Sequence, residues 1–172
     1  MHEKLKQIEL LLFDVDGVMT DGRIIWDAQG VETKAFNVKD GHGIKLVQRA
    51  GVQVGIITGR TSPVVDLRAR ELGIEILYQG ALVKLDCYQE IKQRTGLQDH
   101  QIAYMGDDVI DVPVMRRVAF SAVPADALPE VAAIADYVAR SKGGMGAVRE
   151  LCDLVLKGRG VWQELVVDRY EL

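Results

Sequence analysis

The sequence predicts an α/β fold, a Rossmann-like parallel sheet with helices on both faces, and two observations lead to it. Short apolar runs recur along the 172 residues, and several of them end on glycine or on a polar side chain. Segments with the 3.6-residue periodicity of amphipathic helices lie between these runs. Strands that alternate with helices over this length form a parallel sheet that is covered on both faces.

Six strands are expected in this sheet. The apolar runs Leu10–Phe13 and Val52–Ile57 have the composition of strands that are buried on both faces. A third run, Ile102–Met105, is shorter and ends on Gly106-Asp107. The weaker candidates are residues 75–78, 118–121 and 137–138.

Five helices are expected, and small residues mark most of their ends. Gly51 and Gly73 each follow a periodic segment as a helix-terminating glycine would, and Gly158 closes the last one. Ser62-Pro63 has the pattern of an N-cap followed by proline at the first helical position. The five segments are residues 44–50, 63–72, 82–94, 109–117 and 148–156.

The segment of about 18–38 breaks the alternation of strands and helices. Residues 23–27 and 31–38 have the character of two strands around the turn Asp27-Ala28-Gln29-Gly30, which predicts a β-hairpin. The hairpin follows the first strand directly and therefore lies beside the carboxyl end of that strand. Ligands bind at this edge in open α/β sheets, so the hairpin is expected to act as a flap.

Size, charge and cysteine content limit the classes of function. The length fits one domain over 1–172, and the net charge of −4 disfavours nucleic acid or an anionic membrane as partner. Cys87 and Cys152 lack the spacing of a metal site and are expected to be reduced thiols. No signal peptide or membrane span is recognisable, so a cytoplasmic location is expected.

Two segments near the end of the chain, the tail and a glycine-rich loop, each allow more than one interpretation. The tail, residues 158–172, carries Trp162, Leu165, Val166 and Val167, which pack either on this chain or on another subunit. The glycine-rich loop 143–146 precedes a helix but lacks the lysine of a P-loop. Flexible gating or close subunit packing is therefore expected of this loop rather than nucleotide binding.

Acidic side chains follow two strands at the point where each strand ends. Asp14 and Asp16 come directly after the first strand, while Asp107 and Asp108 follow another, with Asp111 three residues on. Parallel strands end at one edge of a sheet, so these carboxylates are expected to share a cleft. Their mutual repulsion is relieved by a hard cation, and Mg²⁺ suits carboxylates that also face a phosphate.

Lys84 and Thr58 complete this predicted cleft. Lys84 opens a helix after Gly80, and Thr58 ends the second strand. A cation and a hydroxyl at these places can hold phosphoryl oxygens through a transition state. A phospho-accepting receiver domain has similar groups, but there the acidic pair follows the first strand, and the acceptor aspartate follows the third strand ahead of the threonine and the lysine. Here Thr58 and Lys84 come before the acidic pair Asp107-Asp108, and the candidate nucleophile lies at the first strand. A catalytically inactive scaffold is the other alternative, although every expected catalytic side chain is present.

These residues resemble the four motifs of the haloacid dehalogenase superfamily of phosphohydrolases. The first motif is matched by Asp14-Val15-Asp16-Gly17-Val18, and the fourth by Gly106-Asp107-Asp108 with Asp111. Thr58 and Lys84 match the second and third. The gaps between motifs hold only a hairpin and single helices, so the chain resembles the capless members, which often close the site with a neighbouring subunit.

The resemblance implies a role for each matched residue. Asp14 would be the nucleophile that carries an aspartyl-phosphate, and Asp16 the general acid and base. Thr58 and Lys84 would bind the phosphoryl group. Mg²⁺ would be held by Asp14, by the backbone carbonyl of Asp16 and by Asp107, with Co²⁺ and Mn²⁺ as alternatives. Asp108 and Asp111 are expected to lie behind these metal-binding groups and to hold them in position.

Within the superfamily the chain is similar to the 3-deoxy-D-manno-octulosonate 8-phosphate phosphatases of lipopolysaccharide synthesis. The similarity rests on residues 14–22, 39–41, 58–60, 79–80, 106–111 and 143–150. It implies a phosphorylated sugar acid as substrate and a homotetramer with shared active sites. Arg60 and Arg68 are the candidate partners of the substrate carboxylate, and Thr20 and Gly59 are counted with them as substrate-binding residues. The alternative substrates are a nine-carbon sugar acid 9-phosphate, although members of that branch tend to carry an acidic residue in place of Arg60, or another small metabolite.

Overall fold

The computed structural model describes residues 2–172, and its centre is one sheet of six parallel strands. The strand order is β5-β4-β1-β6-β7-β8, so β1 (Leu10–Phe13) lies between β4 (Gln53–Ile57) and β6 (Ile102–Met105). The outer strands are β5 (Ile76–Tyr78), β7 (Phe120–Val123) and β8 (Tyr137–Val138). The predicted α/β class and all six strands are confirmed, although β7 begins two residues later than expected.

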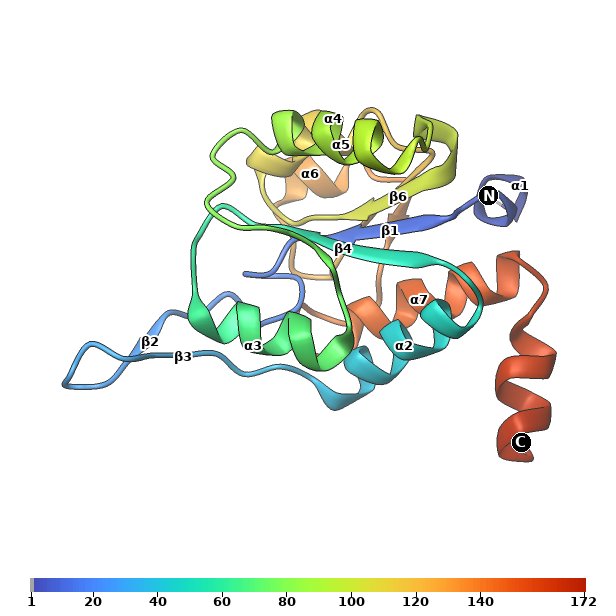
Figure 1. Cartoon of the computed structure of the whole chain (residues 1–172), viewed down its shortest axis with the longest axis horizontal. Coiled ribbons are helices and arrows are strands. Elements are labelled where there is room, and N and C mark those ends of the chain that lie inside the picture. The colour runs from blue at the N-terminus through green and yellow to red at the C-terminus, as the bar shows by residue number, and fades with distance from the viewer. Residues whose placement is uncertain (1) are drawn as a thin grey trace.

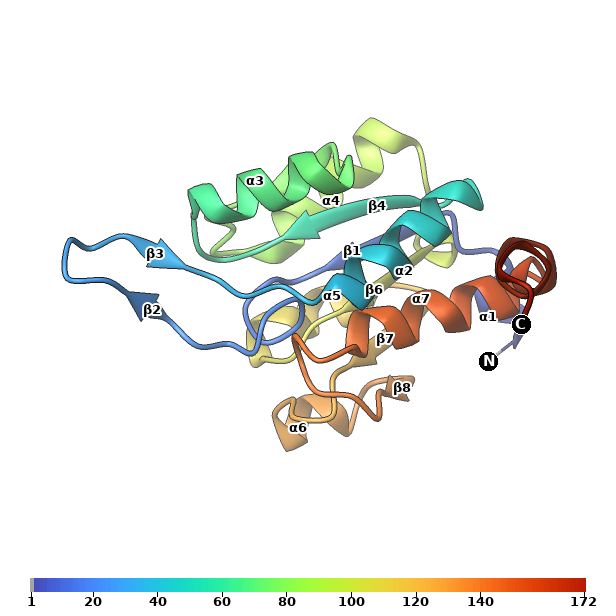
Figure 2. The same ribbon diagram turned by 90° about the horizontal axis from the view of Figure 1, so that it is seen from below.

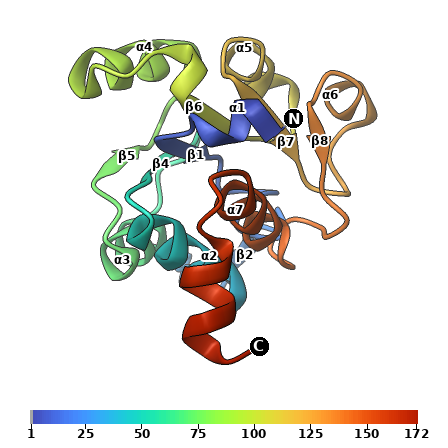
Figure 3. The same cartoon turned by 90° about the vertical axis from the view of Figure 1, so that its right-hand side faces the viewer.

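Helices cover both faces of this sheet (Figure 1). α2 (Val38–Arg49), α3 (Pro63–Leu72) and α7 (Ala147–Gly158) lie on one face, and α4 (Lys84–Thr95), α5 (Val112–Met115) and α6 (Pro129–Ala132) on the other. The end-on view in Figure 3 shows the same three layers. Alternate residues of β1 serve the two cores: Leu11 and Phe13 pack on the side of α7, and Leu10 and Leu12 on the side of α4. This explains why the strand is apolar throughout.

The expected helix over residues 109–117 is wrong as a continuous element. The chain forms a 3₁₀ turn, η2 (Val109–Asp111), and then the short α5, in which Pro113 occupies the first turn. Asp108 and Asp111 each accept a hydrogen bond from the other end of η2, which is a capping box. This local pairing overrides the apolar periodicity that suggested one helix.

Glycines end α2 and α3 as predicted, but Gly158 has another function. Gly51 and Gly73 have φ of +79° and +65°, the left-handed conformation that glycine adopts without strain. Gly158 is still helical, and a Cβ atom there would lie 2.3 Å from Cβ of Leu5. Gly158 therefore permits close packing of α7 against α1 (His2–Lys6).

A two-stranded antiparallel hairpin follows β1, as predicted from the sequence. Its strands, β2 (Ile25–Trp26) and β3 (Glu32–Thr33), are shorter than expected, and Val38 already belongs to α2. Figure 2 shows the hairpin projecting from the carboxyl end of β1, while the chain ends at the opposite side of the molecule. Its action as a flap stays a prediction.

The tail packs on its own chain, which is one of the two alternatives considered. It begins after α7 and forms a π-helical segment, η3 (Gln163–Asp168), whose Val166 is buried in the main core. The Tyr170 hydroxyl accepts a hydrogen bond of 3.2 Å from Arg49 and lies 3.1 Å from Nε2 of His42. None of the helices formed within residues 2–172 has both the length and the apolar character that crossing a membrane requires.

Candidate active site

The site is built on the carboxyl ends of β1 and β6, which lie side by side. Asp14 directly follows β1 and its backbone N–H donates to the carbonyl of Met105 at 3.0 Å, so the ends of the two strands are tied together. Its own carboxyl accepts a hydrogen bond of 2.6 Å from the N–H of Val15. Only 5% of Asp14 is exposed. The nucleophile candidate is thus held rigidly at the base of the cleft.

Lys84 is the cation of this buried cluster. It stands at the first position of α4, where the helix dipole disfavours a positive charge. Its Nζ atom lies 2.8 Å from Oδ2 of Asp14 and 2.6 Å from Oδ1 of Asp111, and its side chain is 0% exposed. The two carboxylates therefore compensate both the burial of the ammonium and its unfavourable place on the helix.

Asp111 uses both carboxyl oxygens to hold other parts of the site. Oδ1 accepts from Lys84 and, at 2.5 Å, from the hydroxyl of Tyr104, while Oδ2 accepts from the backbone N–H groups of Asp107 and Asp108 at 3.0 and 3.2 Å. These four donors occupy the acceptor sites that a carboxylate offers. Asp111 thus fixes the loop that carries Asp107 and has little capacity left for a cation.

Asp14, Asp107, Asp111 and Lys84 together form what we call the floor of the site. Oxygen atoms of its three carboxylates lie within 4.8 Å of one another. Burial raises the pKa of Asp14 to about 6, against the effect of Lys84, and the pKa of Asp107 to about 7, with the charges of Asp14 and Asp111 adding to it. One lysine does not neutralise three carboxylates, so the floor favours a second cation.

Asp107 shows where this cation fits. Its Oδ1 atom is buried and has no hydrogen-bond partner. A buried oxygen without a partner is costly, and a hard cation satisfies it as carboxylate ligands do in magnesium sites. Asp14 and Asp107 are therefore suited to hold Mg²⁺, whereas the four donors around Asp111 place it behind them.

Two glycines let the chain pass close to these carboxylates. A Cβ atom on Gly17, which has φ of +90°, would lie 2.1 Å from Oδ2 of Asp107. A Cβ atom on Gly106 would lie 2.3 Å from Cγ of Asp111. The glycines of the first and fourth motifs are therefore required by the space that the carboxyl groups take.

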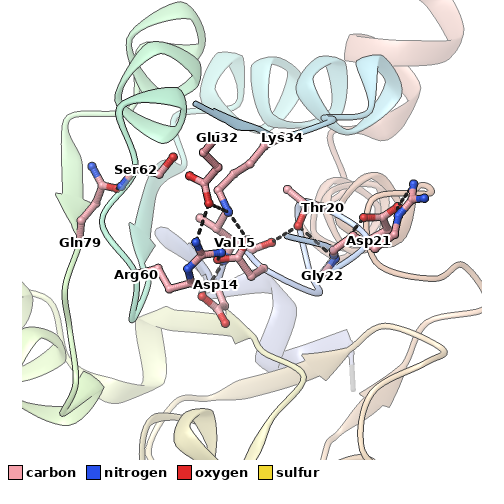
Figure 4. A network of polar contacts seen from close by, with 12 residues as sticks. Asp14, Val15, Thr20, Asp21, Gly22, Glu32, Lys34, Arg60, Ser62 and Gln79 are labelled. Carbon is pink, nitrogen blue, oxygen red and sulfur yellow. Dashed lines mark hydrogen bonds and ion pairs between the residues drawn. The ribbon is translucent and has the colours of Figure 1, made fainter. Parts of the chain in front are cut away.

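The hairpin adds a second cluster of charges, which we call the rim: Asp16, Glu32, Lys34 and Arg60. The ammonium of Lys34 forms an ion pair with Oδ1 of Asp16 and lies 3.6 Å from Oε1 of Glu32. Arg60 lies 2.6 Å from the same oxygen of Glu32 and 3.9 Å from Oδ2 of Asp16. Figure 4 shows Glu32 and Lys34 pointing from the hairpin strand toward Arg60.

A cavity of about 160 Å³ lies between the two clusters and is lined by Asp14 and Asp107 of the floor and by Asp16 and Arg60 of the rim, but not by their other members. Its lining includes Thr58, Gly59 and Arg60, three of the residues predicted to bind substrate or phosphate. The remaining lining residues are Asp14, Asp16, Asp107, Asp108 and Ile110. One N–H-bearing atom of Arg60, Nη1, is buried without a hydrogen-bond partner, so the guanidinium retains a free donor.

Two predicted substrate-binding residues do not line this cavity. The hydroxyl of Thr20 donates to the carbonyl of Val15 at 3.4 Å and accepts from the N–H of Gly22 at 3.2 Å, so it braces the loop after β1. Arg68 lines a different surface cavity. It donates to the carbonyl of Asn37 at 3.3 Å, and its guanidinium lies 5.5 Å from the ring centre of Phe36. Contact of either residue with substrate has no support from this arrangement.

Asp108 and the glycine-rich loop also have structural functions. Asp108 is exposed and caps η2 through a hydrogen bond of 2.6 Å from the N–H of Val109. A Cβ atom on Gly143 would lie 1.8 Å from the carbonyl oxygen of Gly17, so the loop packs on the backbone after β1. The loop therefore packs against the first motif within one chain, and its use in gating or subunit packing stays a prediction.

Sequence reasoning missed Tyr104, Glu32 and Lys34. The apolar run Ile102–Met105 indicates only a strand at Tyr104, although a buried tyrosine needs a partner for its hydroxyl. Glu32 and Lys34 are two residues apart in a strand-like segment and therefore lie on the same face. That spacing could have indicated a shared partner, but it is equally typical of a solvated hairpin.

Similar proteins are known, although no family model matches the chain. The 3-deoxy-D-manno-octulosonate 8-phosphate phosphatase of Yersinia pestis is 50% identical over 154 residues, which are 90% of this chain and 82% of that protein. The phosphatase of this name from Moraxella catarrhalis, solved with magnesium, phosphate and KDO, is 38% identical, with a TM-score of 0.95 and coverage of 98% and 97%. A cobalt-bound form of the Haemophilus influenzae phosphatase is 36% identical, with a TM-score of 0.92 and coverage of 98% and 99%.

Proposed function

Because the chain belongs to the 3-deoxy-D-manno-octulosonate 8-phosphate phosphatases, a family of the haloacid dehalogenase superfamily, we propose that it hydrolyses this sugar-acid phosphate to the free sugar acid and phosphate. The reaction supplies the sugar acid for lipopolysaccharide synthesis, and we place it in the cytoplasm. The observation that supports it best is the floor, where Asp14, paired with the buried Lys84, and Asp107, whose buried Oδ1 atom has no hydrogen-bond partner, line one cavity.

Residues of the floor, the rim and the end of β4 divide the chemistry of the first step. A carboxyl oxygen of Asp14 attacks phosphorus, the bond from phosphorus to the sugar oxygen breaks, and Asp16 gives its proton to the departing alkoxide. Lys84 and Thr58 hold the phosphoryl oxygens while charge builds on them. The products of this step are the sugar acid and an aspartyl-phosphate.

The second step restores the enzyme. Asp16, now a carboxylate, takes a proton from water, whose oxygen attacks phosphorus and breaks the bond to Asp14. Asp14, Asp107 and the backbone carbonyl of Asp16 are the residues that would hold Mg²⁺, which when bound supplies charge neutralisation for the phosphoryl group. Asp111 keeps Asp107 and Lys84 in place through hydrogen bonds, and Asp108 caps the 3₁₀ turn η2 that carries Asp111.

Substrate binding outside the phosphoryl group is assigned to Arg60 and Gly59. The free Nη1 donor of Arg60 can receive a carboxylate or hydroxyl of the sugar acid, and Gly59 leaves room beside it. We further propose that residues 1–172 act as one phosphatase domain and assemble as a homotetramer with shared active sites. The exposed apolar side chains of the hairpin, Ile24, Ile25, Trp26 and Val31, support such an assembly.

Phosphate release from a panel of sugar-acid, hexose and nucleotide phosphates, with Mg²⁺, Co²⁺, Mn²⁺ or EDTA, tests the proposal. We expect metal-dependent release that strongly prefers the eight-carbon substrate. Preference for a nine-carbon sugar acid 9-phosphate would keep the mechanism and change the substrate. Asp14→Asn should lose turnover by more than about 1,000-fold and remain folded, while the exposed Asp86→Asn on α4 is the matched control. Full activity of Asp14→Asn would refute the nucleophile.

A further inference from the structure

Lys34 is an unusual residue for its place in the fold. It directly follows β3 in a hairpin that exposes Ile25 and Trp26 by 40% and 58%, yet only 1% of the Lys34 side chain is exposed. A lysine on a two-stranded hairpin normally keeps its ammonium in water, because burial of an unpaired charge is costly. The buried position of Lys34 therefore depends on the carboxylates that it meets.

The partners of Lys34 form a closed ring of alternating charge. Asp16 contacts Lys34 with one carboxyl oxygen and faces Arg60 with the other, while Glu32 contacts both cations. When Asp16 is ionised, as in the second step of the reaction, two positive and two negative groups leave the ring without net charge. The Asp16 carboxyl is consequently held by Lys34 of the hairpin, while Nη1 of Arg60 lies 3.9 Å from its other oxygen, beyond hydrogen-bond distance.

Lys34 does not reach the substrate cavity. The lining of that cavity includes Asp16 and Arg60 but neither Lys34 nor Glu32. Lys34 therefore contacts the acid–base residue from behind. A residue in this place can set the position of Asp16 without touching the substrate.

We propose that Lys34 is a positioning residue of the phosphatase reaction, which holds the Asp16 carboxyl in the orientation that both proton transfers need. Glu32 contacts both Lys34 and Arg60 and so fixes the positions of these two side chains relative to each other. The inference rests on the proposed role of Asp16, and it makes the acid–base steps depend on the hairpin being seated on its own chain. A proton-transfer group that is misplaced by about 1 Å loses much of its effect.

Kinetics separate this role from substrate binding. Lys34→Met keeps the length of the side chain and removes its charge, and we expect kcat for the sugar-acid phosphate to fall about 10- to 100-fold, within the range of general acid–base catalysis, with KM changed less than about threefold. Lys34→Arg should recover part of kcat. Lys39→Met, on an exposed lysine five residues away, is the matched control and should behave as wild type.

A substrate with a good leaving group gives a second readout. The leaving group of p-nitrophenyl phosphate departs without a proton, so Lys34→Met should still phosphorylate Asp14 rapidly and then hydrolyse the intermediate slowly. We expect a burst of about one nitrophenolate per site in Lys34→Met. A merely structural lysine would lower the active fraction and produce no such burst.

Several results would overturn the inference. They are a rise in KM with unchanged kcat, equal kcat in wild type and Lys34→Met, or the absence of a burst in a folded Lys34→Met protein. If Lys34→Met does not fold, Lys34→Arg and Lys34→Gln test the inference instead. The inference requires kcat to be highest in wild type, lower in Lys34→Arg and lowest in Lys34→Gln, with KM constant. A wild-type protein that releases no phosphate from any ester would instead refute the proposed function itself.

Discussion

The floor and the rim of the cleft are two charge clusters of opposite design. The floor places three carboxylates around one buried lysine, and the pKa values of Asp14 and Asp107 are raised to about 6 and 7, first of all by burial. The rim pairs two carboxylates with two cations, and the pKa of Glu32 is lowered by the nearby Ser62 hydroxyl and by Lys34 and Arg60. The floor is incomplete without a further cation, whereas the rim is balanced by this chain alone. The difference supports the proposals that the floor binds the metal and that the rim positions side chains.

Removing the cation of the floor should have the largest effect. Lys84→Met leaves Asp14 and Asp111 buried without their shared partner, and breaking such a pair costs about 3–5 kcal/mol of unfolding free energy. We expect phosphate release to fall more than about 1,000-fold, because in the proposed mechanism Lys84 also binds the phosphoryl group. Lys92→Met on the same helix removes a pair with the exposed Asp99 and a contact with the ring of Tyr88, and it should change both quantities little. Near-normal stability of Lys84→Met would contradict the view that the floor is held by this lysine.

The excess negative charge of the floor should also appear in the pH dependence of stability. In the unfolded chain both aspartates have pKa values of about 4, so at pH 5–7 the folded protein binds more protons than the unfolded one. The free energy of unfolding should therefore fall as pH rises through this interval, by an amount on the order of a few kcal/mol, in metal-free buffer. Mg²⁺ should reverse most of the fall. Thermal unfolding at pH 5, 6, 7 and 8, with Mg²⁺ or EDTA, measures it, and equal midpoints without metal would contradict the comparison.

The same contrast explains what the sequence could predict. Asp14, Asp107 and Lys84 stand at the ends of strands or the start of a helix, so the topology of a parallel sheet alone brings them together. Lys34 and Glu32 belong to a hairpin whose strands are two residues long, and their partners depend on how that hairpin folds back. No local pattern distinguishes Lys34 from a solvated lysine.

Local pairing explains the other differences from the sequence prediction. The apolar spacing of residues 109–117 favoured a helix, but the capping box between Asp108 and Asp111 forms a 3₁₀ turn instead. Arg68 lies on a helix near the cleft, yet the ring of Phe36 and the carbonyl of Asn37 hold it away from the cavity. Both depend on side-chain geometry that residue types and spacing do not contain.

Opening the rim should have a moderate effect that metal does not repair. Glu32→Gln removes the carboxylate shared by Lys34 and Arg60, and we expect a loss of about 1–2 kcal/mol in unfolding free energy, since a hydrogen bond to a charged group is lost at a partly exposed site. Because the rim binds no metal in this scheme, Mg²⁺ should stabilise Glu32→Gln and wild type equally. Denaturant unfolding with and without Mg²⁺ compares them, and a loss that Mg²⁺ removes would join the rim to the metal site.

The smallest effect is expected at Asp108, which lies between the two clusters and belongs to neither. Its side chain is exposed and caps η2, so Asp108→Ala should cost about 1 kcal/mol, the usual contribution of a helix N-cap. Asp108→Asn retains an acceptor and should recover most of this loss. Because Asp111 holds the N–H of Asp107 independently, at 3.0 Å, phosphate release should fall by less than about tenfold in Asp108→Ala. If Asp108→Ala reduced phosphate release as much as Lys84→Met, the prediction would be wrong. Asp108 would then belong to the floor and would bind the metal or the phosphoryl group directly.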